Sequence, residues 1–150
     1  MRKALLFSVL LLASAAGSQT VPGRFDGAWN TTVTCDPAGS TLGYTLHLVS
    51  MVTGNFMHGE RGAKGQPAYL AIDGKIGNDG KAKLTATGVT AGPQFTHGPL
   101  KAEGQTYSYD VKAEFQDTEG KGERSTGLGI VGRPCHWMWE KQSAPAPSKP

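Results

Sequence analysis

The strongest constraint in this sequence is an alternation of apolar and polar side chains with a period of two. The clearest example runs from Tyr107 to Phe115, where apolar or aromatic residues alternate with polar or charged ones. Successive side chains of a β-strand point to opposite faces, so the pattern predicts a strand with one buried and one solvated face. This kind of strand is typical of antiparallel sheets.

Similar alternation recurs along the chain and predicts about eight strands. We expect them near residues 26–35, 43–52, 55–60, 68–76, 81–88, 106–116, 122–131 and 135–141. Asn78-Asp79-Gly80 is a strong hairpin signal, and we expect residues 119–122 to turn the chain after the strand that ends near Phe115. Glycine accounts for 21 of the 150 residues, and turns and bulges with positive φ explain much of it.

No part of the sequence shows a convincing helical period, so the fold class is all-β. Consecutive hairpins form an up-and-down antiparallel meander. Eight strands can close such a meander into a barrel, which leaves no exposed sheet edge. We therefore predict a closed barrel of about eight strands, formed by one domain over residues 25–142 with the segment 17–24 in front of it.

Both ends of the chain are expected to lie outside this barrel. Residues 1–16 combine basic Arg2 and Lys3 with an apolar run and small residues near Ala16, the pattern of a cleaved secretory signal. A buried N-terminal helix is the alternative. Residues 143–150 are rich in proline and have no apolar anchor, which predicts a disordered tail.

Export implies a periplasmic or secreted protein. Removal of the signal also leaves the rest of the chain with little net charge. The formal net charge of +3 comes from 15 basic and 12 acidic residues, and loss of Arg2 and Lys3 with the signal leaves 13 basic ones. Charges of both signs alternate over residues 112–124, which indicates a solvated surface rather than a nucleic-acid-binding face. We expect a monomer with no membrane anchor.

The sequence contains two cysteines, Cys35 and Cys135. In an oxidising compartment we expect them to form a disulfide. One ends the first predicted strand and the other begins the last, and these strands are neighbours in a closed barrel. Such a bond closes a loop of about 100 residues, which is worth roughly 4–5 kcal/mol in the chain-entropy model. Two free thiols or an intermolecular bond are the alternatives.

Two groups of residues resemble known families. Gly27-Ala28-Trp29, with Arg133 before the last strand, resembles the Gly-x-Trp…Arg arrangement of the calycin barrels (lipocalin and avidin-like). This resemblance implies a calycin-like barrel in which the tryptophan closes the base and the arginine packs across it. The segments 25–35, 70–80 and 132–135 resemble a group of small exported bacterial proteins, which implies export from a bacterium and no particular activity.

Sequence patterns of catalysis and metal binding are mostly missing. The chain has no Gly-x-Ser-x-Gly nucleophile elbow, and its acidic residues fall at polar strand or turn positions. His58-Gly59-Glu60 supplies two ligand types, but His47, His97 and His136 do not complete a known metal-binding spacing. We predict no metal and no cofactor, and we favour a non-enzymatic protein, with an enzyme as an open alternative.

An aromatic inner face is the best candidate for a binding site. Seven aromatic residues fall at positions expected to face inward: Trp29, Tyr44, Tyr107, Tyr109, Phe115, Trp137 and Trp139. They form either a packed core or the lining of a cavity for a small apolar ligand, which eight-stranded barrels can hold. For the second interpretation we expect the ligand to contact Trp29, Tyr44, Tyr107, Tyr109 and Trp137.

A protein-binding module, such as a periplasmic protease inhibitor, is the alternative function, based on architecture alone. Its expected contact region is the irregular, proline- and glycine-rich segment 88–104. A transmembrane barrel is not expected, because the strand over residues 81–87 is short and polar.

Overall fold

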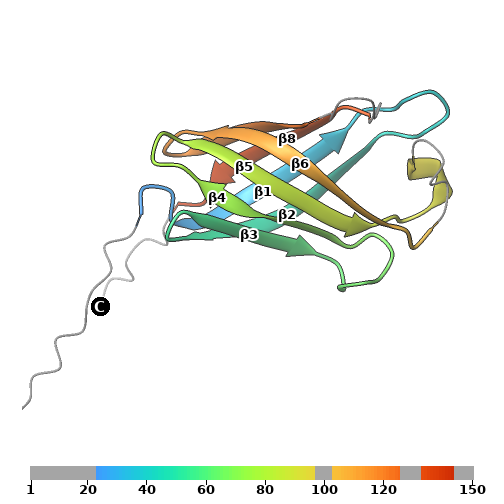
Figure 1. Ribbon diagram of the computed structural model, residues 1–150, viewed down its shortest axis with the longest axis horizontal. Helices are drawn as coiled ribbons and strands as arrows, with labels where there is room; N and C mark the ends of the chain where they lie inside the picture. The colour runs from blue at the N-terminus through green and yellow to red at the C-terminus, as the bar shows by residue number, and fades with distance from the viewer. Residues whose placement is uncertain (1–22, 97–102, 126–132, 144–150) are drawn as a thin grey trace, which may run out of the picture.

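A computed structural model of the protein describes residues 23–96, 103–125 and 133–143 (Figure 1). The predicted signal over residues 1–16 and nearly all of the predicted tail lie outside the described residues. Eight strands follow one another along the chain: β1 Gly27–Cys35, β2 Tyr44–Thr53, β3 Phe56–Arg61, β4 Leu70–Ile76, β5 Lys81–Val89, β6 Thr106–Phe115, β7 Glu119–Arg124 and β8 Cys135–Lys141. A 3₁₀ helix, η1 (Pro93–Phe95), lies between β5 and β6.

Each strand pairs with the next in antiparallel fashion, and β8 pairs with β1 to close the barrel. The predicted all-β, eight-stranded closed meander is therefore confirmed. None of the helices within the described residues is long and apolar enough to cross a membrane.

The pairing of β1 with β8 sets the closing seam of the barrel. Cys35 and Cys135 lie directly opposite each other in this register and form a disulfide, as predicted. Both cysteines are almost completely buried. The disulfide indicates an oxidising, extracytoplasmic location, because such bonds persist in oxidising compartments.

The two ends of the barrel differ in the length of their connections (Figure 1). The turn end carries the short connections 54–55, 77–80 and 116–118, together with the segment that leads into β1. The loop end carries the longer connections 36–43 and 62–69, the β5–β6 connection with η1, and the disulfide. Inward-facing side chains are fully buried at the turn end and partly exposed at the loop end, and the candidate site lies at the loop end.

Aromatic side chains fill the turn end completely. Phe25, Trp29, Phe115 and Trp139 are all buried there. The Phe115 ring lies 5.5 Å from Trp29, edge to face, and 5.0 Å from Trp139 between ring centroids. The Trp29 indole Nε1 donates a hydrogen bond of 2.9 Å to the Phe25 carbonyl oxygen. This end is therefore a packed core. The sequence left open whether the aromatic residues form a packed core or line a cavity, and at the turn end they form a core.

The Asp26 carboxylate holds the entering chain against the turn end. It accepts hydrogen bonds from the backbone N–H of Gly23, at 2.9 Å, and of Asn55, at 3.2 Å. These backbone donors favour the charged carboxylate and lower the pKa of Asp26. The contact joins the segment before β1 to the turn between β2 and β3.

β7 lies earlier than the sequence pattern predicted. The strand begins at Glu119, so residues 119–122 form the strand rather than the expected turn, and 126–131 of the predicted strand lie outside the described residues. Gly120 and Gly122 face the barrel interior. A Cβ on Gly120 would lie 2.5 Å from Phe115 Cδ1, and one on Gly122 would lie 3.0 Å from Trp139 Cζ3. Large aromatic neighbours, rather than a turn, explain these glycines.

The structure also corrects the Trp–Arg contact that the calycin resemblance implied. Trp29 lies at the turn end, whereas Arg133 lies at the loop end, just before β8 begins. β1 and β8 run antiparallel, so a residue near the start of one is far from the start of the other. The cation above the Trp29 ring is Lys141, with its Nζ 5.6 Å from the ring centroid, and Arg133 stacks on Tyr44 instead.

Removal of the disulfide should destabilise the barrel. We expect the double variant C35S/C135S to lose about 4–5 kcal/mol of unfolding free energy, because its unfolded chain regains the entropy of an open loop of about 100 residues. Urea unfolding of the oxidised wild type and the double variant measures the difference. A reductant should destabilise the wild type and leave the double variant unchanged; equal stabilities would contradict the entropic role.

Substitution of Gly122 should lower the stability of the barrel, because neighbouring side chains already fill the interior beside it. We expect Gly122→Ala to lower the unfolding free energy by about 1–3 kcal/mol, since the new methyl group overpacks Ala113 and Trp139. Lys121→Ala, on the exposed face of the same strand, is the matched control and should change little. Urea unfolding compares the two, and similar small effects would show that this position has spare room.

Candidate functional site

Inward-facing side chains at the loop end remain partly exposed, unlike those at the turn end. Tyr44 and Leu46 on β2 and Tyr107 and Tyr109 on β6 occupy inward positions in their strands, yet each is of intermediate burial. We call these four residues, with Arg124 and Arg133, the loop-end cluster. Solvent therefore reaches part of the inner face of the barrel here.

The two β6 tyrosines form a stacked pair within this cluster. Their ring centroids are 6.0 Å apart and the ring planes are inclined by 12°. Gly88 lies opposite Tyr107 on β5, and only a glycine leaves room for the Tyr107 phenol there. Burial disfavours the phenolate and strongly raises the pKa of both Tyr107 and Tyr109. Both hydroxyls therefore remain protonated donors at neutral pH.

Two arginines place positive charge beside these aromatic rings. The Arg124 guanidinium carbon lies 4.5 Å from the Tyr109 ring centroid, and that of Arg133 lies 4.3 Å from the centroid of Tyr44. Arg133 is 5% exposed. Its Nη1 donates to the Leu42 carbonyl oxygen and its Nη2 to the Phe95 carbonyl oxygen, the latter at 2.9 Å.

Arg133 therefore holds two segments of the loop end together, in addition to placing a positive charge there. Its two hydrogen bonds join the chain before β2 to η1, and the Phe95 ring packs edge to face on Tyr44 at 6.1 Å. These contacts hold Tyr44 in its position in the loop-end cluster.

Two indole N–H groups beneath the cluster have no acceptor. Trp137 and Trp139 are buried and stacked at 5.7 Å, and the Nε1 of each lacks a hydrogen-bond partner within the described part of the chain. The Trp137 N–H lies near the Tyr109 phenol, where it favours the ionised form, but not in hydrogen-bond geometry. By contrast, the buried hydroxyls of Thr31 and Ser50 bond each other at 2.7 Å. Unpaired buried donors are rare and costly.

The structure places the predicted ligand-contacting residues in two groups. Tyr44, Tyr107, Tyr109 and Trp137 lie near one another at or just below the loop end. Trp29 belongs to the same continuous core but lies at the turn end, against Phe115. Sequence reasoning missed Arg124 and Arg133 as members of this group. The signal for Arg124 was its spacing of two from Gly122 and of four from Gly120, which places it on the inner face once β7 is correctly positioned.

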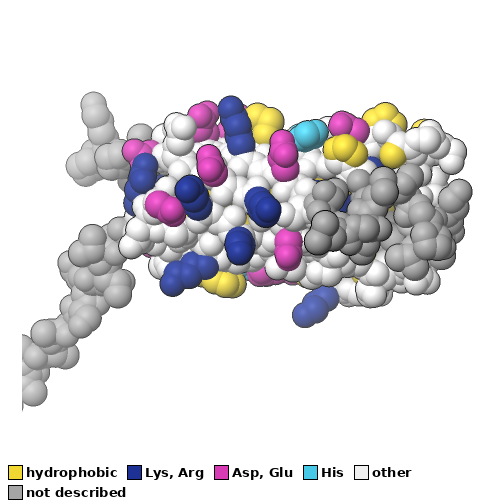
Figure 2. Space-filling model, turned by 45° about the horizontal axis from the view of Figure 1, so that its top comes forward, with side chains coloured by type: hydrophobic (Ala, Val, Ile, Leu, Met, Phe, Trp, Pro, Cys, Tyr) yellow, Lys and Arg dark blue, Asp and Glu magenta, His cyan; other side chains and the backbone are white. Residues whose placement is uncertain are grey.

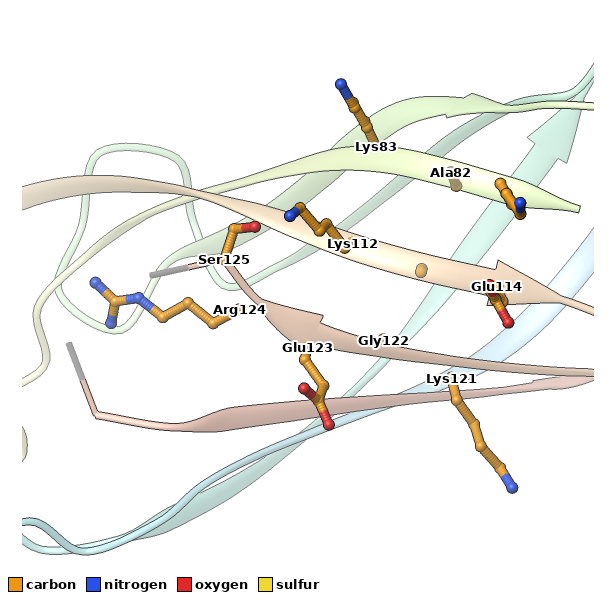
Figure 3. Close-up of a pocket in the computed structure, with 11 residues that line it drawn as sticks. Ala82, Lys83, Lys112, Glu114, Lys121, Gly122, Glu123, Arg124 and Ser125 are labelled. Atoms are coloured by element: carbon orange, nitrogen blue, oxygen red, sulfur yellow. The ribbon is translucent and has the colours of Figure 1, made fainter. Parts of the chain in front are cut away.

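The outer surface of the barrel carries charged side chains and a groove over β5–β7. Figure 2 shows acidic and basic side chains interspersed on one face of the barrel. A shallow groove over β5–β7 is bordered by outward side chains such as Lys83, Lys112 and Glu123, and Arg124 lies at one end of it. In Figure 3 the Arg124 side chain extends from the end of β7, away from Glu114 and Lys121. Arg124 is of intermediate burial, and its guanidinium stacks on the inward-facing Tyr109 ring.

The histidine of the His58-Gly59-Glu60 fragment forms a hydrogen-bonded pair with an aspartate on the outer wall. His58 Nδ1 lies 2.6 Å from Asp73 Oδ1, across β3 and β4. A hydrolytic triad needs a nucleophile on the other side of such a histidine, but the residue opposite His58 on β2 is Met51. Glu60 instead accepts a hydrogen bond from the Tyr69 hydroxyl, at 3.1 Å.

The remaining predicted features give no site of their own. His47 and His136 lie on the exposed face of β2 and β8, and His97 lies outside the described residues. Across residues 23–96, 103–125 and 133–143, no group of three His, Cys, Asp or Glu side chains has a metal-binding arrangement. Of the segment 88–104, the structure describes the end of β5, η1 and its flanks, but not residues 97–102.

Comparisons with protein-family models, with curated proteins and with solved structures each gave no match to this chain.

The buried tyrosines should make the barrel unstable at high pH. The unfolded phenols ionise near their ordinary pKa of about 10, whereas burial raises the folded pKa of Tyr107 and Tyr109. Their contribution to stability is therefore complete below pH 10 and is lost as the pH rises above it. Urea unfolding between pH 8 and 11 should show this fall. Tyr109→Phe should reduce the fall and Ser108→Ala should not; identical slopes would contradict the assignment.

Proposed function

We propose that this protein is an exported, non-enzymatic β-barrel that binds a small, largely apolar ligand at the loop-end cluster. The observation that carries the proposal is the contrast between the two ends of one barrel. The turn end is closed by four buried aromatic side chains, whereas Tyr44, Tyr107 and Tyr109 face inward and remain partly exposed.

The composition of the cluster supports a ligand with flat or flexible apolar surface. Ligand sites are typically lined by aromatic and apolar side chains with a few placed polar groups. Here the stacked rings of Tyr107 and Tyr109, with Leu46 nearby, offer apolar surface, and the unpaired Trp137 N–H offers a donor. A bound acceptor at Trp137 would satisfy that buried group, since a buried donor without a partner is destabilising.

Two further features support a binding role in an exported protein. The disulfide suits a periplasmic or secreted protein, because it needs an oxidising compartment. The His58–Asp73 pair has Met51, which is not a nucleophile, opposite its histidine on β2. A binding protein explains both ends of the barrel without any reactive group.

Binding should be visible through the tryptophan fluorescence. We expect the neutral apolar probe 1-aminoanthracene to change the protein fluorescence saturably, because Trp137 lies below the cluster and stacks on Trp139. Tyr109→Ala should weaken the probe at least tenfold, or about 1.4 kcal/mol. Ser108→Ala, which alters the outward neighbour on the same strand, is the matched control and should bind like the wild type.

Circular dichroism of each variant checks that the barrel is intact. The absence of a saturable signal with apolar probes of several sizes, in folded wild-type protein, would overturn the proposed binding function. Binding that persists in Tyr109→Ala would place the ligand elsewhere on the molecule.

A further inference from the structure

Every polar side chain in the loop-end cluster, and Trp137 beneath it, can donate a hydrogen bond. Arg124 has no hydrogen bond and no ion pair to any described residue, and its known contact is the stacking on Tyr109. Arg133 donates two hydrogen bonds to backbone carbonyl oxygens and has no carboxylate partner among the described side chains. The Trp137 N–H is unpaired, and the hydroxyls of Tyr107 and Tyr109 remain protonated.

Negative charge is kept away from the inner face of the barrel. Every acidic residue on the eight described strands occupies an outward position, and most of them are exposed. The cluster therefore contains two guanidinium charges and no carboxylate. Both charges act on the Tyr107 hydroxyl, where they favour its ionised form, so both converge on the same small region. A partly desolvated cation without a counter-ion is unfavourable unless a ligand supplies one.

We propose that the loop-end cluster selects anionic ligands, specifically a carboxylate joined to a small aromatic or aliphatic body. Arg124 is the residue that pairs with the carboxylate, because it is partly exposed and has no hydrogen bond or ion pair to another described residue. Its planar guanidinium suits a bidentate hydrogen bond to a carboxylate. Arg133 is fixed by backbone carbonyls and adds its charge from a constant position. The apolar body of the ligand lies on the tyrosine rings and toward Trp137.

This inference rests on the proposed binding function and specifies the chemistry of its ligand. It also explains why Arg124 occupies an inner-face position that follows two glycines on β7. Gly120 and Gly122 make room for aromatic rings at the turn end, and the same face of the strand ends in a long cation at the loop end. A structural role for Arg124 alone would give no preference between a charged and a neutral ligand.

Matched pairs of probes test the inference by isothermal titration calorimetry at pH 7. The pairs are 2-naphthoate with 2-naphthamide and octanoate with octanamide, which differ in charge and hardly in shape. We expect each carboxylate to bind the wild type at least tenfold more tightly than its amide. The preference should shrink as the ionic strength is raised from 50 to 500 mM, because salt screens charge pairs.

Variants at position 124 separate charge from packing. Arg124→Gln should abolish the preference, so that each carboxylate binds no more tightly than its amide, whereas Arg124→Lys should keep most of the preference. Lys121→Gln removes an outward charge from the same strand and is the matched control, expected to keep the full preference.

The outcomes distinguish the two proposals. If carboxylates and amides bind the wild type equally, the anionic preference is wrong and the binding function stands. If none of the four probes binds folded wild-type protein, the binding function fails and the ligand preference fails with it. A preference that survives in Arg124→Gln would overturn the role of Arg124.

Discussion

The pairing of β1 with β8 converts a chain of hairpins into a barrel with no free edge, and the Cys35–Cys135 disulfide is built into that pairing. An open sheet would offer unpaired backbone groups at both edges. Closure also decides which side chains are inside, because a strand that slipped by one residue would turn its apolar face outward. The core and the loop-end cluster both depend on this register.

A closed barrel with this sequence is necessarily asymmetric along its axis. Phe25, Trp29, Phe115 and Trp139 need space at the turn end, and glycines on β7 provide it. The same inner face carries tyrosines and arginines at the loop end, whose polar groups need solvent or a partner. One half of the interior is therefore filled by packed aromatic side chains, while the other half keeps aromatic surface that is partly exposed.

The alternation of side chains was sufficient to predict the number of strands, their order and nearly all of their positions. It failed at β7, because glycines at 120 and 122 resemble a turn when their aromatic neighbours are unknown. It also grouped Trp29 with the tyrosines, since period two reports which face a residue is on and not how far along the barrel it lies. Arg124 was missed because β7 was placed too late in the sequence, and Arg133 was expected beside Trp29 rather than beside Tyr44.

The sequence by itself determined the period-two alternation, hence the antiparallel meander, and two cysteines positioned to join its first and last strands. These follow from local geometry, because a strand alternates its faces whatever surrounds it. Only the tertiary structure decided that the aromatic residues divide between a filled end and an accessible one. That division depends on strand register and on contacts such as Arg133 with the Phe95 carbonyl, which join residues far apart in the chain.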